Sequence, residues 1–247
     1  MKGFMKMNEI DAINMRQSRR SYQSTPIAPD KRLKLRAIIE EYNQESGLSI
    51  QLIEQGKEAF QGLNVSYGMF SGVQSFFAMV GKKSDPNLKE KIGYYGELLV
   101  LESTKLELGT CWIGATYNHK KCPCVLDEDE SLVLIITVGN VNQKKSFKEN
   151  IIYKVTHRRT KTIEQLTLTD SPLPEWFIEG MEAVKKAPSA MNLQPVLFQF
   201  KNGVVTAKVS NTENHQLIDL GIAKAHFELG ACGKFEFGNN APFKKQL

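Results

Sequence analysis

A cluster of basic and hydroxyl residues near the start of the chain has the chemistry of an anion-binding site. The run reads Arg16-Gln17-Ser18-Arg19-Arg20. In an extended backbone alternate side chains point to the same side, so Arg16, Ser18 and Arg20 would face one way. Guanidinium groups beside a hydroxyl match the oxygens of a phosphate monoester. The same residues could instead form a solvated basic turn, and this segment alone leaves both interpretations open.

A polar loop over residues 187–195 could recognise a planar heterocycle. It reads A-P-S-A-M-N-L-Q-P, and its prolines stiffen the connection between a predicted helix and a predicted strand. Ser189, Asn192 and Gln194 offer groups that both donate and accept hydrogen bonds, as a ring with alternating donors and acceptors requires. The alternative is a loop whose polar side chains satisfy its own backbone.

Two further segments could approach a ligand. Glycines bracket the apolar run Gly109-Thr110-Cys111-Trp112-Ile113-Gly114, where backbone N–H groups can come close to a bound molecule. This run could equally be a core strand that follows a helix end. His157-Arg158-Arg159-Thr160-Lys161 is a second basic cluster, which could join the first on one phosphate or be a solvated strand end.

The surrounding pattern alternates helices and strands, which predicts an α+β or α/β class. Apolar residues at helical spacing predict helices, and short apolar runs bounded by turn residues predict strands. The Asn202-Gly203 dipeptide predicts a hairpin. The predicted helices are 7–15, 29–42, 87–108, 175–185 and 217–229, and the predicted strands are 49–53, 75–80, 131–138, 197–200 and 204–209.

An internal repeat accompanies this pattern. Glu107-Leu108-Gly109-Thr110-Cys111 and Glu228-Leu229-Gly230-Ala231-Cys232 both follow apolar helical patterns. Farther upstream, the helix starts at Pro29 and Pro172 are separated by the same number of residues as the strand starts at Gln51 and Gln194. Short helices that end near glycine are common, so chance is the alternative. We expect two halves, 1–170 and 171–247, joined near the Pro-rich stretch before residue 175.

The composition excludes several classes of protein. The chain has 247 residues, of which 41% are hydrophobic and 24% charged, and its net charge is +5. These values are typical of a globular protein. No apolar stretch approaches the ~20 residues of a membrane helix, and no signal peptide is recognised. Four cysteines do not form a disulfide scaffold, so a cytoplasmic location is expected. The mild basic excess lacks the aromatic interleaving of a nucleic-acid-binding surface.

Taken together, these segments resemble the FMN-dependent nitroreductase family. R-x-S-x-R resembles its phosphate-binding opening, and A-P-S-x-x-N-x-Q-P resembles the loop that contacts the isoalloxazine ring. The stretch from Gly96 through Gly114 resembles the helix and loop that run along the flavin. The run to Arg159, ahead of T-I-E-Q-L, resembles the closing basic motif. The resemblance covers nearly the whole chain and is strongest to the subgroup called TM nitroreductases.

The resemblance implies a nitroreductase-like α+β fold and a set of FMN contacts. Arg16, Ser18 and Arg159 would bind the phosphate, Gln17 would lie beside the ribityl chain, and Arg20 would lie near the N1–O2 edge of the ring. Pro188, Ser189 and Asn192 would contact the ring, with Gln194 in support. Backbone N–H groups around Ile113, Gly114 and Ala115 would lie near N5, and Trp112 would belong to the same cofactor-binding set.

The resemblance also implies an activity. Hydride would pass from NADH or NADPH through FMN to a nitroaromatic, a quinone or a related small-molecule acceptor. The flavin carries this chemistry, so no catalytic side chain and no metal is predicted.

The order of the motifs suggests how the site is built. Dimers of the family form each flavin site from both subunits, with the Arg motif from one and the P-S-x-x-N loop from the other. Here the Arg motif lies in the first half and the loop in the second. We therefore expect an intrachain pseudo-dimer that keeps one composite site, either as a monomer or within a homo-oligomer.

Two alternatives to this enzyme stay open. The chain could bind FMN without turnover, as a sensor or carrier. His119, Cys122 and Cys124 could serve a metal or redox role, although a C-x-C with one histidine supplies too few ligands for a closed zinc site.

Overall fold

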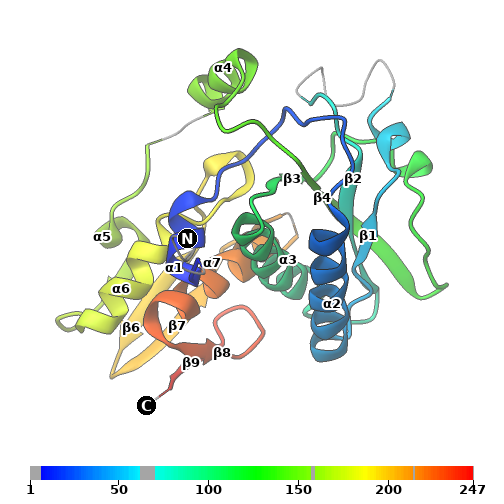
Figure 1. Ribbon diagram of the computed structural model, residues 1–247. Coiled ribbons are helices and arrows are strands. Elements are labelled where there is room, and N and C mark those ends of the chain that lie inside the picture. Colours follow the sequence, from blue (N-terminus) through cyan, green and yellow to red (C-terminus); the bar gives the residue numbers. More distant parts are fainter. Residues whose placement is uncertain (1–6, 62–69, 157–158, 214, 247) are drawn as a thin grey trace.

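Two sheets, each packed against two helices, form the computed structural model, and their strands are antiparallel except for the β5–β6 pair. It describes residues 7–61, 70–156, 159–213 and 215–246. The first sheet has the strand order β1-β2-β4-β3, and the second has β5-β6-β7-β9-β8. Helices α3 and α7 lie between the sheets, as Figure 1 shows. No helix in the described ranges is both long and apolar enough to cross a membrane.

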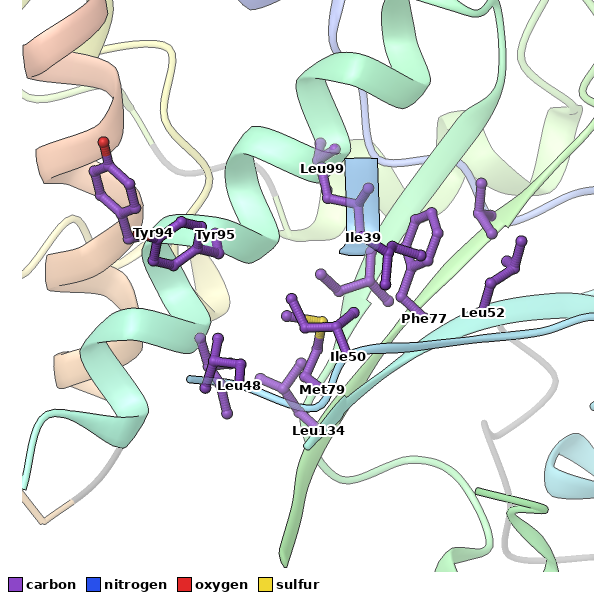
Figure 2. Packing of buried hydrophobic residues seen from close by; sticks show 14 of the residues in the cluster. Ile39, Leu48, Ile50, Leu52, Phe77, Met79, Tyr94, Tyr95, Leu99 and Leu134 are labelled. Carbon is purple, nitrogen blue, oxygen red and sulfur yellow. The ribbon is translucent and has the colours of Figure 1, made fainter. Parts of the chain in front are cut away.

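The first half contributes α2 and α3 with the first sheet. The elements are α2 (Pro29–Ser46), β1 (Gln51–Ile53), β2 (Ser75–Lys82), α3 (Leu88–Lys105), β3 (Gly109–Ile113) and β4 (Glu130–Gly139). Proline at the first helical position starts α2, and Gly47, at φ 71°, ends it in the left-handed conformation. Figure 2 shows the core between these helices and the sheet, where Ile39 and Leu99 meet Phe77 and Met79.

The second half repeats this plan with smaller elements. They are α6 (Glu175–Val184), β6 (Leu197–Lys201), β7 (Val204–Lys208), α7 (Gln216–Ala231), β8 (Gly233–Phe235) and β9 (Pro242–Lys245). Its core is aromatic, with the Phe227 ring 5.0 Å from that of Phe198 and 5.2 Å from that of Phe177. Asn202 and Gly203 both have positive φ, as the predicted two-residue hairpin requires.

The remaining elements connect the halves. They are α1 (Glu9–Met15), 3₁₀ turns at Lys57–Phe60, His119–Lys121 and Ala190–Asn192, α4 (Phe147–Thr156), α5 (Ile163–Leu166) and β5 (Thr167–Thr169). Strand β5 pairs in parallel with β6, and Leu166 packs in the second core. The expected boundary at 170 therefore falls after a segment that packs with the second sheet. Helix α1 packs against both halves, through Leu101 of α3 and Ala183 of α6.

The two halves share one topology. In each, the order helix, strand, strand, helix, strand, strand gives a sheet in which the last strand lies between the second and third, β1-β2-β4-β3 and β6-β7-β9-β8. The letters E-L-G-x-C, however, do not mark equivalent positions. Glu107 is a left-handed residue beyond α3, whereas Glu228 lies within α7, whose left-handed residue is Cys232. The repeat lies in the order of elements and not in that motif.

Helices α3 and α7 cross through a reciprocal pair of glycines. A Cβ at Gly93 would lie 2.0 Å from the carbonyl oxygen of Ile218, and a Cβ at Gly221 would lie 2.0 Å from that of Glu90. Each glycine thus meets the carbonyl three positions before the other glycine. Such mutual contacts are those of a two-fold axis between equivalent surfaces.

Most predicted elements are present with similar ends. Helix α3 stops at Lys105, short of the predicted Leu108, because Glu107 turns left-handed and Gly109 already belongs to β3. The run 109–114 is therefore mainly a strand. The patterns did not predict α4, β5, β8 or β9, which are short or exposed.

We predict that Gly93→Ala lowers the free energy of unfolding by about 3 kcal/mol, because the added methyl collides with backbone that cannot rotate away. Helix propensity alone predicts the opposite sign, a gain of about 1 kcal/mol for alanine over glycine. Urea unfolding followed by circular dichroism measures the difference, with Glu41→Ala on the exposed face of α2 as the control. A stabilised Gly93→Ala protein would contradict the close crossing.

Candidate functional site

The N-terminal arm over residues 16–21 runs along the edge of β3. Ser18 forms a parallel bridge with Thr110, and the Arg19 N–H donates to the Thr110 carbonyl at 2.8 Å. Arg19 is buried, whereas Arg16, Ser18 and Arg20 are only partly covered. The predicted alternation is confirmed by this arrangement, and Gln17 is exposed.

Arg16, Ser18 and Arg20 surround one residue of β3. Burial raises the pKa of the Cys111 thiol, while the charges of Arg20 and Arg16 and a hydrogen bond with Ser18 act to lower it. Ser18 therefore contacts Cys111, and the two arginines lie close enough to act on the thiol through their charge. Among the described residues no carboxylate pairs with Arg20, whose guanidinium lies 6.0 Å from the Phe70 ring.

Glu149 of α4 fixes the backbone of the arm from its other side. Its Oε1 accepts from Arg19 Nε at 3.1 Å, from the Arg20 N–H at 2.7 Å and from the Ser21 N–H at 3.2 Å. Burial would raise the pKa of Glu149, but these hydrogen bonds and one from the Ser146 N–H lower it to about 2. Sequence patterns predicted neither α4 nor this role.

The polar loop over 187–195 is held by its own side chains and by α7. Ser189 Oγ accepts from the Gln194 N–H, and Asp219 Oδ1 accepts from the Ala190 N–H, each at 2.9 Å. Met191, Asn192 and Gln194 all have φ near +50°, a conformation that is costly outside glycine. The loop therefore satisfies part of its own backbone while keeping a strained shape, and recognition of a planar ring stays a prediction.

Gln194 joins this loop to the second basic cluster. Its Oε1 accepts from the Lys161 N–H at 2.9 Å, and its carbonyl accepts from Lys161 Nζ at 2.8 Å. Its Nε2 donates to the Arg159 carbonyl at 3.4 Å. The Arg159 side chain is exposed beside a hollow of about 360 Å³ that residues 159–162 and Gln165 line. His157 and Arg158 lie outside the described residues.

The arm and the loop meet directly. Arg16 Nη2 donates to the carbonyl of Lys186 at 3.2 Å, one residue before the loop begins. Two segments far apart in the sequence, which only the family resemblance had grouped, are therefore neighbours. Arg16 Nε is buried without a hydrogen-bond partner, and its nearest acceptor is Glu97 Oε1 at 3.6 Å.

Glu97 lies at the centre of this region, although the family resemblance covered it only within the stretch from Gly96 to Gly114 and gave it no role of its own. Its Oε1 forms a hydrogen bond with His226 Nε2 at 2.9 Å, and its Oε2 accepts a hydrogen bond from Trp112 Nε1 at 3.0 Å. The other ring nitrogen of His226 faces the Ala183 carbonyl at 3.0 Å. Glu97 and His226 have no exposed side-chain surface. A charged residue within an apolar helical pattern was the signal that could have revealed them.

The segment after α3 divides its side chains between the two faces of the first sheet. The Trp112 ring lies over Gly96 of α3, where a Cβ would meet it at 2.5 Å. Ile113 is buried in the cluster on the far face of the sheet. A Cβ at Gly114 would lie 3.1 Å from the His215 ring of the second half.

The C-x-C segment lies in a different cluster. Cys122 and Cys124 are partly buried free thiols that pack beside Tyr117, whose ring stacks on His119 at 4.0 Å. Within the described ranges no three His, Cys, Asp or Glu side chains gather as a metal site needs.

Comparison with known proteins places the chain in a family. Residues 8–231 match the family described as "Putative TM nitroreductase", so the chain belongs to that family and is of the oxidoreductase kind. No curated protein matches it.

One solved structure shares this fold over nearly the whole chain. A putative nitroreductase from Thermotoga maritima MSB8 is 19% identical, with a TM-score of 0.62 over 98% of this chain and 95% of that one. A nitroreductase with bound FMN from Bacteroides fragilis NCTC 9343 is 13% identical, with a TM-score of 0.46 over 65% of this chain and 98% of its own. An FMN-dependent nitroreductase from Clostridium difficile R20291 is 16% identical, with a TM-score of 0.42 over 60% and 98%.

We predict that Glu149→Gln lowers the free energy of unfolding at pH 7 by about 3 kcal/mol. The pKa of Glu149 is lowered to about 2, so its ionised form contributes stability above its ordinary value of 4.5. That contribution to stability is lost as the pH falls from about 4.5 to about 2. Urea unfolding at several pH values should show wild type and variant converging in acid, and a gap that persists at pH 2 would contradict the assignment.

Asp219 predicts the opposite pH dependence. Burial raises its pKa from 3.8 to about 6, although the Ala190 N–H acts to lower it. Ionisation of Asp219 therefore destabilises the folded protein, and this destabilisation reaches its full size above about pH 6. Asp219→Asn keeps an acceptor for Ala190 and should raise the free energy of unfolding at pH 7 by about 2 kcal/mol. The gain should vanish below pH 4, and a less stable variant at pH 7 would refute it.

Proposed function

We propose that this chain is an FMN-dependent NAD(P)H oxidoreductase that reduces a nitroaromatic, a quinone or a related small acceptor. The hydrogen bond from Arg16 to the Lys186 carbonyl carries the proposal, because it brings the cationic arm and the polar loop to one place. Family membership supports the chemistry, and FMN appears in the descriptions of two structures of similar fold.

The donors present fit the cofactor. Arg16 directs Nη2 to the Lys186 carbonyl and Nε toward Glu97, which leaves the other end of its guanidinium for a ligand, and Arg20 forms no ion pair within the part of the chain that the structure describes. A phosphate oxygen would satisfy such donors with short, charge-assisted hydrogen bonds. Arg16 and Ser18 would hold the phosphate together with Arg159, Gln17 would lie beside the ribityl chain, and Arg20 would place positive charge near the ring edge.

The loop would supply the ring contacts. The Ser189 hydroxyl already accepts from the Gln194 N–H, so its own hydrogen is available to a ring acceptor. Pro188 and Asn192 would border the ring, and Gln194 would act indirectly, through its three bonds to the backbone and side chain of residues 159–161. Backbone at 112–114 would face the ring from the side of the first half.

Bound FMN would supply the redox chemistry, accepting hydride from NADH or NADPH and returning electrons to the second substrate. The protein would contribute orientation, positive charge and exclusion of water. Met191 and Leu193 expose 69% and 43% of their surface on the loop, which suits an apolar, planar acceptor.

We further propose that the two halves are a fused pseudo-dimer with one cofactor site. The shared topology and the reciprocal glycine contacts support a former two-fold interface between α3 and α7. The equivalent place in the other half is filled with side chains, since Phe237 packs on Tyr94 and Tyr95 and Lys91 Nζ donates to the Ser46 carbonyl at 3.0 Å. One FMN per chain is therefore expected, whether the chain is a monomer or assembles further.

The decisive experiment compares binding with turnover. The protein reconstituted with FMN is mixed with NADH or NADPH without oxygen, and bleaching of the flavin absorbance is followed. Bleaching that an added quinone or nitroaromatic reverses supports the oxidoreductase. FMN binding without bleaching would favour a sensor or carrier, and no FMN binding would overturn the proposal.

We predict that Arg16→Ala and Ser189→Ala, made separately, each weaken FMN binding by about tenfold or more, since each removes a hydrogen bond worth at least 1.4 kcal/mol in a partly buried site. Fluorescence titration of the apoprotein with FMN measures the dissociation constants. Arg36→Ala removes an equal charge from an exposed residue of α2 and should bind like wild type. Loss in only one of the two variants would contradict a site shared between the halves.

A further inference from the structure

Four segments converge on one buried carboxylate. Glu97 of α3 contacts His226 of α7, Trp112 of β3 and, at 3.6 Å, Nε of Arg16 on the arm. His226 continues the chain of contacts to the Ala183 carbonyl in α6, the helix that leads into the polar loop. The first half supplies Glu97, Trp112 and Arg16, and the second half supplies His226.

The geometry constrains the proton that Glu97 and His226 share. A carbonyl oxygen can only accept, so His226 Nδ1 must carry a hydrogen toward Ala183. Its Nε2 then either donates to ionised Glu97 or accepts from protonated Glu97. In both cases one proton lies between the two side chains, and neither can leave the contact without exposing an unpaired buried group.

We propose that Glu97 is a positioning residue that aims the Arg16 guanidinium at the FMN phosphate, and that His226 holds Glu97 in place to do so. The inference rests on the proposed function. Arg16 Nη2 is committed to the Lys186 carbonyl, and Nε is turned toward Glu97. With these two donors directed to the protein, the remaining donors of the guanidinium are left for an anion.

Two observations distinguish a positioning role of Glu97 from a purely structural role in the core. Glu97 lies close enough to bias the orientation of Arg16 but too far for a full hydrogen bond, so it does not satisfy the cation by itself. Glu90 lies seven residues earlier on α3, about two turns away on the same face. It is also buried, and it pairs with Lys224. Within the described residues Glu90 hydrogen-bonds to Lys224 and the Gly238 N–H and to no residue of the arm, which makes it a matched control.

The test is a double-mutant cycle on FMN affinity. Glu97→Gln is expected to raise the FMN dissociation constant about tenfold in the wild-type background. In the Arg16→Ala background the same change should have little further effect, because its target is gone. Glu90→Gln should lower the unfolding midpoint yet leave the FMN dissociation constant unchanged. Additive effects of Glu97→Gln and Arg16→Ala would overturn the proposal.

A second pair of variants covers the case in which Glu97→Gln does not fold. His226→Gln keeps a donor toward Glu97 and should retain most of the FMN affinity, whereas His226→Leu should lose it about tenfold. Equal affinities for these two variants would overturn the role of His226. Wild-type protein that binds no FMN would defeat the proposed function itself, whereas wild type and Glu97→Gln that bind FMN equally would defeat only the positioning role.

Discussion

A buried carboxylate must be neutralised where it lies, and this requirement organises the region around Glu97. Removing an ion from water costs several kcal/mol unless partners replace the lost hydration. Here the partners come from distant parts of the chain, with Trp112 and His226 in contact and the Arg16 cation nearby. Bringing them together fixes β3, α7 and the arm against α3. The same contacts bring Arg16 to the start of the polar loop.

The crossing of α3 and α7 makes this possible. Glycines at 93 and 221 allow the two helix backbones to approach until each meets the carbonyl of the other. At a wider separation the His226 ring could not reach both Glu97 and the Ala183 carbonyl. The two glycines therefore allow polar contacts between the halves, because the close crossing brings His226 within hydrogen-bonding distance of Glu97.

The two halves differ in how their loops are held. Each loop before a strand is tied to the neighbouring long helix, but with opposite polarity. Asp219 of α7 accepts from the Ala190 N–H, whereas Lys91 of α3 donates to the Ser46 carbonyl. The first loop is flanked by a buried aromatic cluster, and Lys224, whose pKa is lowered by burial, is buried against Glu90 nearby. The loop of the first half therefore borders a packed interface, whereas the loop of the second half, over residues 187–195, keeps its polar side chains.

Local chemistry allowed much of this to be predicted from the sequence. Pro29 begins α2, Asn202-Gly203 forms the hairpin, and alternation correctly separated Arg19 from the other arginines of the arm. Features that depend on long-range pairing were not predictable in this way. Glu149 and the Glu97–His226 pair acquire their roles only from partners far along the chain, and short exposed strands such as β8 have too few residues to show a period.

The strained loop shows why such long-range pairing matters for a site. Met191, Asn192 and Gln194 hold left-handed backbone that unfavourable sterics would otherwise relax. Asp219 and Lys161 restrain it from opposite sides, by hydrogen bonds to the Ala190 N–H and the Gln194 carbonyl. Because burial raises the pKa of Asp219, that restraint itself costs stability near neutral pH. A loop kept in shape by several unfavourable elements together is preorganised, so a ligand that matches it need not supply the ordering energy on binding.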